Sequence, residues 1–305
     1  MTTASAYTTT LNSITYEYPF ERCISILLYL FDEVVVADGG STDGTLEKLE
    51  EMAALDPKLK VYSRPVDLNH PRWAILSDGL LKAEARKMCT KDALWQIDND
   101  QLLCPSPANK DVVKMTSKTC IERMIAIALE QVEFWGDPKV ARADLSPKPM
   151  VSPNLEGLTH GIKAGSEMKD EDGLTYIKPY MSDSCDLIWE SNAQLFYPIG
   201  RLAFSPKIYH TSWLDLQRKV WHYTSLWPDF HKSMYNLSSD HDAMFGKSLD
   251  CVTYEDILSK VVELKQKGPR SFHTYQEDWK GETRELTKNE QEEFELINNY
   301  ALLHK

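Results

Sequence analysis

Acidic side chains follow two apolar runs of this 305-residue sequence, in places where a bound cation or phosphate would need them. Asp38 comes directly after the run Val34–Ala37, and Asp98 and Asp100 come at the end of the run Ala93–Ile97. Both runs suit buried strands, and parallel strands of one sheet end at the same edge. Crowded carboxylates need a compensating cation or donor group, and oxygen ligands suit Mg²⁺ or Mn²⁺, which commonly hold a diphosphate. We therefore expect a Mn²⁺ or Mg²⁺ site at this edge.

The turn after Asp38 has the residue types of a ligand-binding corner. Gly39 and Gly40 allow the backbone to turn sharply or to approach a ligand closely. Thr42 or Asp43 is expected to cap the helix that follows, whose apolar residues recur at helical spacing. In an open α/β sheet, ligands collect at such strand ends.

The Asp-x-Asp spacing by itself is a weak signal, because the triplet occurs three times, at 98–100, 170–172 and 240–242. Only the first triplet directly follows a buried apolar run. The other two are expected to lie in solvated loops, so the metal site is assigned to residues 98–100.

The elements that must position these residues alternate along the first hundred residues. Strands are predicted at 13–16, 34–37, 61–63 and 93–97. Helices are predicted at about 20–30, from the turn after Asp38 to about 55, and from 70 onward. This order predicts an α/β fold with a mostly parallel sheet and helices on both faces. Further on we expect a loop at 104–114, a helix at 116–131, an irregular stretch at 135–173, strands at 174–177, 186–189, 201–204 and 207–210, a helix opened by Ser212 and Asp215, and a last helix at 288–303.

Composition and charge exclude several classes of protein. The 34 basic and 46 acidic residues give a net charge of −12, which opposes non-specific binding to nucleic acid. No apolar run of about 18 residues predicts a transmembrane segment, and the N-terminus lacks a signal-peptide pattern. We expect a cytoplasmic protein, with peripheral contact with a membrane left open. The six scattered cysteines are expected to be reduced and buried.

Two segments resemble a known family. Glu33–Thr45, which contains DGGSTDGT, resembles the nucleotide-binding turn of family 2 glycosyltransferases of the GT-A fold, and Trp95–Asp100 is similar to that family's metal-binding segment. Lys207–Leu216 resembles in part the lipopolysaccharide core β-glycosyltransferases. The resemblance implies a GT-A domain over 1–240, with a donor half at about 1–132 and an acceptor half at about 133–240. A C-terminal helical extension at 241–305 would follow.

The resemblance also implies roles for individual residues. The loop of Thr15, Tyr16 and Glu17 would contact the base and ribose, although the family often has Asn-Glu where this chain has Tyr-Glu. Asp38 would accept a hydrogen bond from the nucleobase. Asp98 would contact the ribose or a metal-bound water, and Asp100 would ligate the metal. His210 would complete the metal shell or contact the diphosphate, unless it is an ordinary strand-end histidine. The predicted nucleotide-binding set is Thr15, Tyr16, Glu17, Asp38, Gly39, Arg64, Arg72, Asp98 and Asn99, and the predicted metal set is Asp98, Asp100 and His210.

The catalytic base should be a carboxylate that takes the proton from the acceptor hydroxyl. Glu190 is the first candidate, because relatives carry a glutamate at the end of the corresponding strand, and Asp183 and Asp186 are the alternatives. Arg64 and Arg72 could assist the diphosphate or simply be solvated. The aromatic residues could stack on an acceptor sugar, although helical spacing favours core packing; they are Trp213, Trp221, Tyr223 and Trp227. His160 and Gly161 could line a pocket, but structural roles are favoured there too.

The function that follows is a metal-dependent, inverting hexosyltransferase. It would move a sugar from a nucleotide-diphosphate sugar, a UDP-sugar in the first instance, to a hydroxyl of a saccharide or glycolipid. One alternative is a sugar-nucleotidyltransferase, which needs a glycine-rich phosphate loop where this chain has Thr15–Tyr18. A second alternative is a non-catalytic GT-A domain that binds a saccharide or a partner. A Rossmann dehydrogenase is disfavoured because no G-x-G-x-x-G follows a strand.

Overall fold

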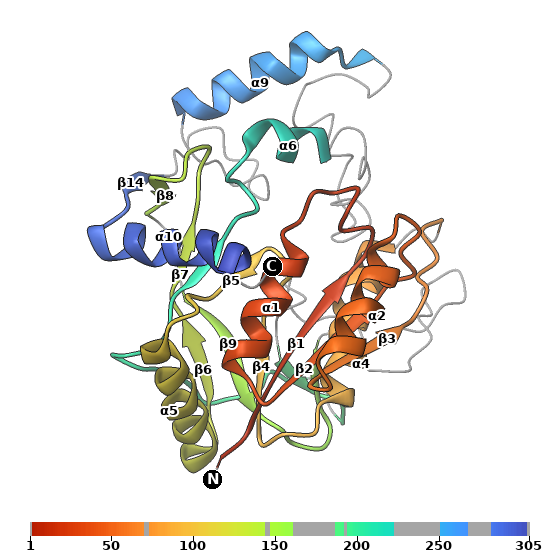
Figure 1. Cartoon of the computed structure of the whole chain (residues 1–305), viewed down its shortest axis with the longest axis vertical. Coiled ribbons are helices and arrows are strands. Elements are labelled where there is room, and N and C mark those ends of the chain that lie inside the picture. The colour runs from red at the N-terminus through yellow and green to blue at the C-terminus, as the bar shows by residue number, and fades with distance from the viewer. Residues whose placement is uncertain are drawn as a thin grey trace.

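The fold is built on a seven-stranded sheet in the order β12-β6-β9-β4-β1-β2-β3 (Figure 1). The computed structural model describes residues 2–69, 73–143, 147–160, 187–191, 194–222, 251–267 and 282–303. The strands are β1 (Ala4–Thr10), β2 (Glu33–Asp38), β3 (Leu59–Ser63), β4 (Ala93–Gln96), β6 (Ala126–Leu129), β9 (Lys148–Pro153) and β12 (Ile199–Arg201). All neighbours pair in parallel except β9, which is antiparallel to both β4 and β6. The predicted α/β fold with a largely parallel sheet is confirmed.

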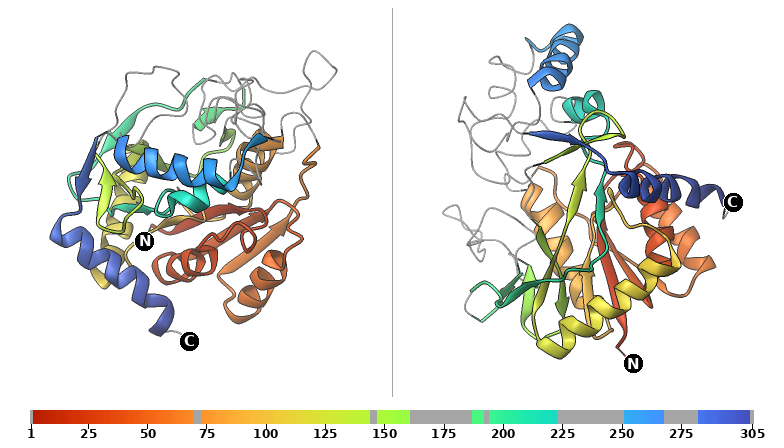
Figure 2. Two further views of the ribbon diagram at one scale, coloured as in Figure 1. Left: turned by 90° about the horizontal axis from the view of Figure 1, so that it is seen from above. Right: turned by 90° about the vertical axis from the view of Figure 1, so that its left-hand side faces the viewer.

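Helices cover both faces of this sheet (Figure 2). Val34 and Val36 of β2 join the core cluster that contains α1 (Phe20–Leu30) and α5 (Pro107–Arg123). Val35 and Ala37 join the cluster that contains α4 (Leu81–Met88). Successive side chains of a strand point to opposite faces, so an uninterrupted apolar run is what a strand covered on both sides requires. The remaining helices of this half are α2 (Thr45–Leu55), α3 (Trp73–Ile75) and the π-helical turn η1 (Leu76–Leu80).

A second, three-stranded sheet lies next to the carboxyl end of β4. It has the order β5-β13-β7, formed by β5 (Gln101–Leu102), β13 (Ile208–His210) and β7 (Gln131–Glu133). The helices α6 (Leu216–Trp221) and α9 (Tyr254–Lys267) pack on each other beyond the carboxyl ends of the central strands, at the top of Figure 1. Two further pairs complete the strands of the described chain: β10 (Leu158–His160) with β11 (Leu187–Trp189), and β8 (Val140–Arg142) with β14 (Thr283–Glu285).

The C-terminal extension is packed onto the main core. Its last helix, α10 (Lys288–Leu303), has the bounds that the sequence predicts, and Phe294 and Ile297 join the cluster around the sheet. The hydroxyl of Tyr209 on β13 donates to Glu293 at 2.8 Å. The extension is not purely helical, because β14 pairs with β8. The last helix is therefore held on the strand that carries His210.

The position of the first strand was predicted wrongly. The strand runs from Ala4 to Thr10, whereas residues 13–17 form a turn in which the Tyr16 N–H donates to the Asn12 carbonyl at 3.0 Å. Threonines dominate β1, and their hydroxyls make the segment look polar. Their β-branched carbons nevertheless suit a pleated, buried surface. Thr15, Tyr16 and Glu17 still lie in the loop after the first strand, as expected.

The segment 104–132 was also predicted wrongly. Instead of a loop and a helix at 116–131, α5 begins at Pro107, where the Ser106 hydroxyl accepts from the Asn109 N–H at 3.1 Å. The helix ends at Arg123, its C-cap Met124 has a φ of 51°, and β6 follows. The apolar residues after 124 form a buried strand, which periodicity over so few residues does not distinguish from a helix. The stretch at 135–173 was expected to be irregular, but its described part contains β8, β9 and β10.

Candidate active site

The turn after β2 is organised by Asp38. One of its carboxylate oxygens accepts from the N–H groups of Gly40 and Ser41 at 2.9 and 2.8 Å. The other accepts from the hydroxyls of Thr10 and Ser41 at 3.1 and 2.5 Å. Four donors fill the usual acceptor capacity of a carboxylate. The side chain is fully buried, so its most direct role is to hold the turn, and the nucleobase contact stays a prediction.

The loop after β1 is hydrogen-bonded to that turn. Thr15 donates its N–H to Asp43 at 2.6 Å, and the Asn12 N–H donates to the Ser41 hydroxyl at 2.8 Å. Asp43 also accepts from the Thr45 N–H and hydroxyl, at 3.1 and 2.6 Å. Burial raises the pKa of Asp43, but these hydrogen bonds outweigh burial and lower it. The predicted base-binding loop and the acidic turn therefore form one unit.

Gly40 is required at this turn, and its neighbour Gly39 is not required in the same way. Gly40 has a φ of 89°, and a Cβ there would lie 2.9 Å from the Cα of Pro65. A Cβ on Gly39 would meet the flexible end of Leu81 at 3.1 Å. The helix α2 starts at Thr45 with Gly44 as its N-cap, one residue later than expected, and the Asp43 carboxylate accepts from the N–H of Thr45, its first residue.

Asp98 stands at the end of β4 in contact with a buried lysine. Its Oδ1 accepts from the Gln96 amide at 2.7 Å and from the Lys82 ammonium at 3.0 Å. Burial raises the pKa of Asp98, and the ammonium of Lys82 opposes that rise. Next to it, Asn99 donates to the Ser13 hydroxyl at 2.9 Å. The Asp-x-Asp segment is thereby joined to the loop after β1.

Asp100 and His210 are brought together, as the sequence predicted. The antiparallel pairing of β13 with β5 places His210 opposite Gln101, and its Nε2 lies 3.4 Å from the Asp100 carboxylate. Its Nδ1 lies 3.4 Å from Glu133, which also pairs with Arg142 at 3.1 Å. Burial raises the pKa of Asp100, but His210 and more distant cations outweigh burial and lower it. Burial lowers the pKa of His210, and the two carboxylates outweigh it and raise that pKa to about 10.

The helix α6 adds positive charge behind Asp100. Arg218 donates to the Glu17 carbonyl at 2.7 Å and to the Thr211 carbonyl at 3.3 Å. Thr211 in turn donates to the Asp100 carbonyl through its N–H at 2.9 Å and through its hydroxyl at 2.8 Å. Lys219 is buried, and burial lowers its pKa to about 8. The loop after β1, the Asp-x-Asp segment and α6 therefore meet at one place.

A metal at this place would have two protein ligands in Asp100 and His210. Within the part of the chain that the structure describes, no three His, Cys, Asp or Glu side chains are arranged to hold a cation on their own. Mg²⁺ and similar ions are often bound by one or two carboxylates together with substrate phosphates. The residues therefore fit a cation that arrives with a diphosphate.

Comparison with known proteins identifies the domain that carries both acidic turns. Residues 6–102 match the sequence profile described as Glycosyl transferase family 2. These residues form a family 2 glycosyltransferase domain. The match includes β1, β2, β4 and the acidic turns after β2 and β4, so the resemblance seen in the sequence is confirmed for this part. No curated protein matches this chain.

Solved structures give only distant similarities. TarS 1-349 from S. aureus is 16% identical, with 86% of this chain and 80% of that chain covered and a TM-score of 0.41. The mannosyltransferase PcManGT from Pyrobaculum calidifontis, in complex with GDP-Man and Mn²⁺, is 18% identical, with 43% and 36% covered and a TM-score of 0.33. Glucosyl-3-phosphoglycerate synthase from Mycobacterium tuberculosis is 21% identical, with 43% of each chain covered and a TM-score of 0.29. The fold of this chain therefore rests on its own topology, and the family assignment rests on the match at residues 6–102.

Glu190 is not placed where a catalytic base would be needed. Strand β11 is antiparallel to β10, with Trp189 opposite Leu158, and the Glu190 N–H donates to the Gly157 carbonyl at 2.8 Å. This end of the hairpin follows Pro153, which pairs with Ala93 at the amino end of β4. Glu190 therefore lies toward the edge opposite Asp100, because β11 runs away from the site. The expectation of a base at Glu190 is corrected, and Asp183 and Asp186 lie outside the described residues.

Other predicted residues have partners elsewhere or lie outside the described chain. Arg64 forms an ion pair with Glu84, and Arg72 is outside the described residues, as are Gly161, Tyr223 and Trp227. Trp213 stacks on Trp135 with ring centroids 5.1 Å apart, which confirms core packing. Trp221 is 36% exposed. His160 lies 2.5 Å from the Tyr7 hydroxyl and is buried, which fits the structural role favoured for it.

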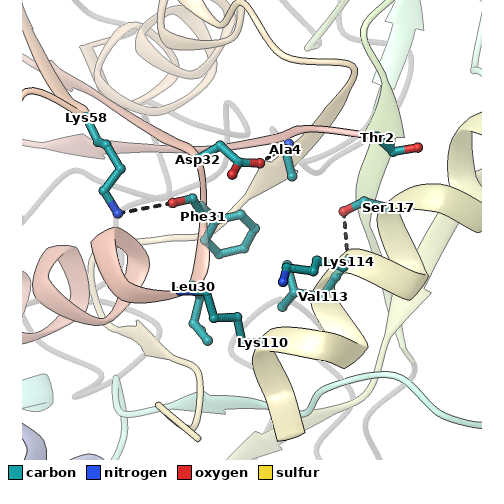
Figure 3. A pocket seen from close by; sticks show the side chains of 10 residues that line it. All are labelled: Thr2, Ala4, Leu30, Phe31, Asp32, Lys58, Lys110, Val113, Lys114 and Ser117. Carbon is teal, nitrogen blue, oxygen red and sulfur yellow. Dashed lines mark hydrogen bonds between the residues drawn. The ribbon is translucent and has the colours of Figure 1, made fainter. Parts of the chain in front are cut away.

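A pocket of about 200 Å³ opens at the opposite edge of the sheet, between β1, α1 and α5 (Figure 3). Its lysines are used within the protein: Lys58 donates to the carbonyls of Leu28 and Phe31 near the end of α1, and Lys110 lies 4.7 Å from the centre of the Tyr29 ring. This pocket is remote from Asp98 and Asp100, which end the strands at the other edge. It is not part of the candidate active site.

Three charged residues of the site were missed in the sequence. They are Lys82, Glu133 and Lys219, and all three are buried. Glu133 ends the three-residue strand β7, which is too short to be predicted from alternation. Lys82 and Lys219 lie on helices, where a lysine is normally solvated. Only an apolar surrounding in three dimensions distinguishes them. No described helix is long and apolar enough to cross a membrane.

Proposed function

We propose that the chain transfers a sugar from a nucleotide-diphosphate sugar, with UDP as the first nucleotide to test, to a hydroxyl group of a saccharide or glycolipid. The observation that carries the proposal is the pairing of Asp100 with His210 at 3.4 Å, inside a family 2 domain and beside the loop after β1. The nucleotide would be held between that loop and the Asp-x-Asp segment. Residues 1–132 remain the proposed donor half and 133–240 the proposed acceptor half.

A divalent cation, Mn²⁺ or Mg²⁺, fits the donor set of Asp100 and His210. When bound, such a cation would neutralise the charge that develops on the departing diphosphate. Asp100 supplies a carboxylate whose lowered pKa keeps it ionised. Glu133 accepts from one ring nitrogen of His210 at 3.4 Å and so orients the other toward Asp100. This arrangement resembles the carboxylate–histidine pairs that fix metal ligands elsewhere.

Transfer with inversion requires a carboxylate base on the acceptor side. Because Glu190 lies toward the far edge, the proposed base is Asp183 or Asp186. The substitutions Asp183→Asn and Asp186→Asn, each measured for sugar transfer and for UDP binding, separate the two. The base variant should lose transfer and keep UDP affinity, whereas the other should keep both.

The proposal is tested by calorimetric titration of UDP with and without Mn²⁺. We expect binding that Mn²⁺ strengthens, and loss of that strengthening in Asp100→Ala. The matched control is Asp111→Ala, which removes an 81% exposed carboxylate on α5, far from the site. Absence of UDP binding, or binding indifferent to both Mn²⁺ and Asp100→Ala, would overturn the proposal. A hydrolysis screen of UDP-, GDP- and dTDP-sugars would then identify the donor.

A further inference from the structure

Lys82 is a buried lysine that contacts the Asp-x-Asp segment from behind. Its side chain is only 2% exposed, although it lies in the first turn of α4. Burying an ammonium group is costly unless carboxylates pair with it. The position therefore has to be explained by its partners.

Two carboxylates pair with this ammonium group. Its Nζ lies 3.0 Å from Oδ1 of Asp98 and 2.8 Å from Oδ1 of Asp78. The side chain of Asp98 is 28% exposed and that of Asp78 is 27% exposed, so the buried ammonium group lies beneath two partly exposed carboxylates. The lysine thus links the end of β4 to the helix that precedes it in the chain.

The π-helical turn η1 brings Asp78 to this position. Asp78 lies inside η1, directly before α4 begins at Leu81. A π-turn inserts a residue into a helix and is frequent at functional sites. Asp78 reaches Lys82 four residues later, at the spacing that places two side chains on one face of a helix. The irregular helix and the buried pair are one structural unit.

The two carboxylate oxygens of Asp98 differ in their hydrogen-bond partners. Its Oδ1 accepts both the Lys82 ammonium and the Gln96 amide, at 3.0 and 2.7 Å. Among the residues that the structure describes, none donates to its Oδ2. One oxygen is therefore fixed by the protein, and the half-exposed carboxylate keeps the other for a ligand.

We infer that Lys82 is a positioning residue of the donor site: it fixes Asp98 for the nucleotide and offsets one of the two negative charges of Asp78 and Asp98, which weakens their attraction for the divalent cation. The inference rests on the proposed function. Asp78, Lys82 and Asp98 together carry one negative charge, whereas Asp100 lies outside the reach of the Lys82 contacts. The cation is thereby directed to Asp100 and His210, and the nucleotide to Asp98.

The variant Lys82→Met removes the ammonium group and keeps the length of the side chain. Asp78 and Asp98 then lose the cation that lies between their Oδ1 atoms. We expect UDP affinity in saturating Mn²⁺ to fall at least tenfold, because Oδ1 of Asp98 loses its main anchor. Without UDP, we expect one additional Mn²⁺ per chain, counted from the free-ion signal in electron paramagnetic resonance.

A double-mutant cycle with Asp98 tests whether Lys82 acts through that residue. We expect K82M/D98N to bind UDP within about twofold of D98N alone and to lose the additional Mn²⁺. Removing both charges together avoids an unpaired buried ion, so this pair of variants decides the question even where K82M alone does not fold. A further fivefold loss of UDP affinity on adding K82M to D98N would overturn the inference.

Lys60→Met is the matched control, since Lys60 pairs with the buried Glu33 at the other edge of the sheet. It should lower thermal stability and leave UDP affinity and Mn²⁺ count unchanged. If K82M showed that same pattern, Lys82 would be a stabilising residue only, and the inference would be wrong. Failure of the unmodified chain to bind UDP would overturn the proposed function, and the Mn²⁺ count would still decide whether Lys82 keeps the cation from Asp98.

Discussion

Strands β2 and β4 both carry carboxylates at their ends, but the protein treats them differently. Glu33 and Asp38, at the two ends of β2, are fully or almost fully buried, and donors of the chain itself surround both. Asp98, at the end of β4, keeps a half-exposed carboxylate with one oxygen to which no described residue donates. Asp100 faces a histidine at 3.4 Å. The carboxylates of β2 are saturated, and those after β4 are compensated by cations while remaining able to accept a ligand.

This difference shows how a carboxylate that stabilises the fold can be distinguished from one that binds a ligand when both lie at the ends of strands. A carboxylate whose lone pairs are all taken by its own chain stabilises the turn it belongs to. A carboxylate that pairs with a cation through one oxygen keeps the other oxygen for a ligand. Four predictions test this division, beginning with the largest expected effect.

Asp100→Asn should lower the rate of sugar transfer on the order of 10³-fold, and it should also lower stability because it removes one partner of the buried pair with His210. The amide removes a charge that a divalent cation would need, and metal assistance contributes several kcal/mol to such reactions. The check is the rate of donor hydrolysis across a Mn²⁺ titration. Asp43→Asn, in the saturated turn, is the comparison, since it should unfold more easily and keep its response to Mn²⁺. If Asp100→Asn kept the response to Mn²⁺, Asp100 would not be a ligand-binding carboxylate and this distinction would be wrong.

Glu33 should make stability depend on pH in acid. Burial alone raises the pKa of this carboxyl, but hydrogen bonds from Lys60, Ser5 and Thr90 outweigh burial and lower it to about 2 from 4.5. A lowered pKa means that the contribution is complete above about pH 4.5 and is lost as the pH falls toward 2. At about 1.4 kcal/mol per unit, it amounts to about 3 kcal/mol.

Urea denaturation of the parent chain and of Glu33→Gln checks this expectation. The difference in free energy of unfolding should be about 3 kcal/mol at pH 7 and should shrink steadily below pH 4.5. A difference that stayed constant down to pH 3 would show that the carboxylate charge of Glu33 is not what the surrounding donors stabilise.

The sequence predicted the site best where local chemistry and strand pattern agree. The apolar runs before Asp38 and Asp98 are buried strands because both faces of the sheet are covered, and their ends fall at one edge. His210 was placed near Asp100 through the family resemblance, and the pairing of β13 with β5 brings them together. The threonine-rich β1 was missed because hydroxyl groups hide its strand character.

Non-local pairing explains most of the remaining errors. The direction of β11 is set by its antiparallel contact with β10, about thirty residues earlier in the chain, and that contact turns Glu190 away from Asp100. Glu133 belongs to a three-residue strand held by β13. Lys82 becomes significant only when α4 packs on the sheet and buries it. None of these relations has a local signature.

Asp38→Asn should destabilise the chain by about 2 kcal/mol, because the new amide group faces N–H donors where a carboxylate oxygen accepted them. The two N–H groups of Gly40 and Ser41 donate to the same oxygen, so one orientation of the amide loses both hydrogen bonds. Chemical denaturation measures the loss. Mn²⁺ binding should be unchanged, and a loss of Mn²⁺ binding without a loss of stability would move Asp38 to the group of ligand-binding acids.

Gly40→Ala should destabilise the chain by about 1–2 kcal/mol, and Gly39→Ala by clearly less. At Gly40 the φ of 89° is unfavourable for any side chain, and the new methyl group would lie 2.9 Å from the Cα of Pro65. At Gly39 the methyl group would meet the ends of Leu81 and Leu11, which can move, and the Thr10 carbonyl at an ordinary contact distance of 3.4 Å. Thermal melting of the two variants side by side checks the ranking. Equal losses would show that crowding rather than backbone conformation decides which side chains the turn tolerates. They would also show that Asp38 holds the turn less tightly than its four hydrogen bonds imply.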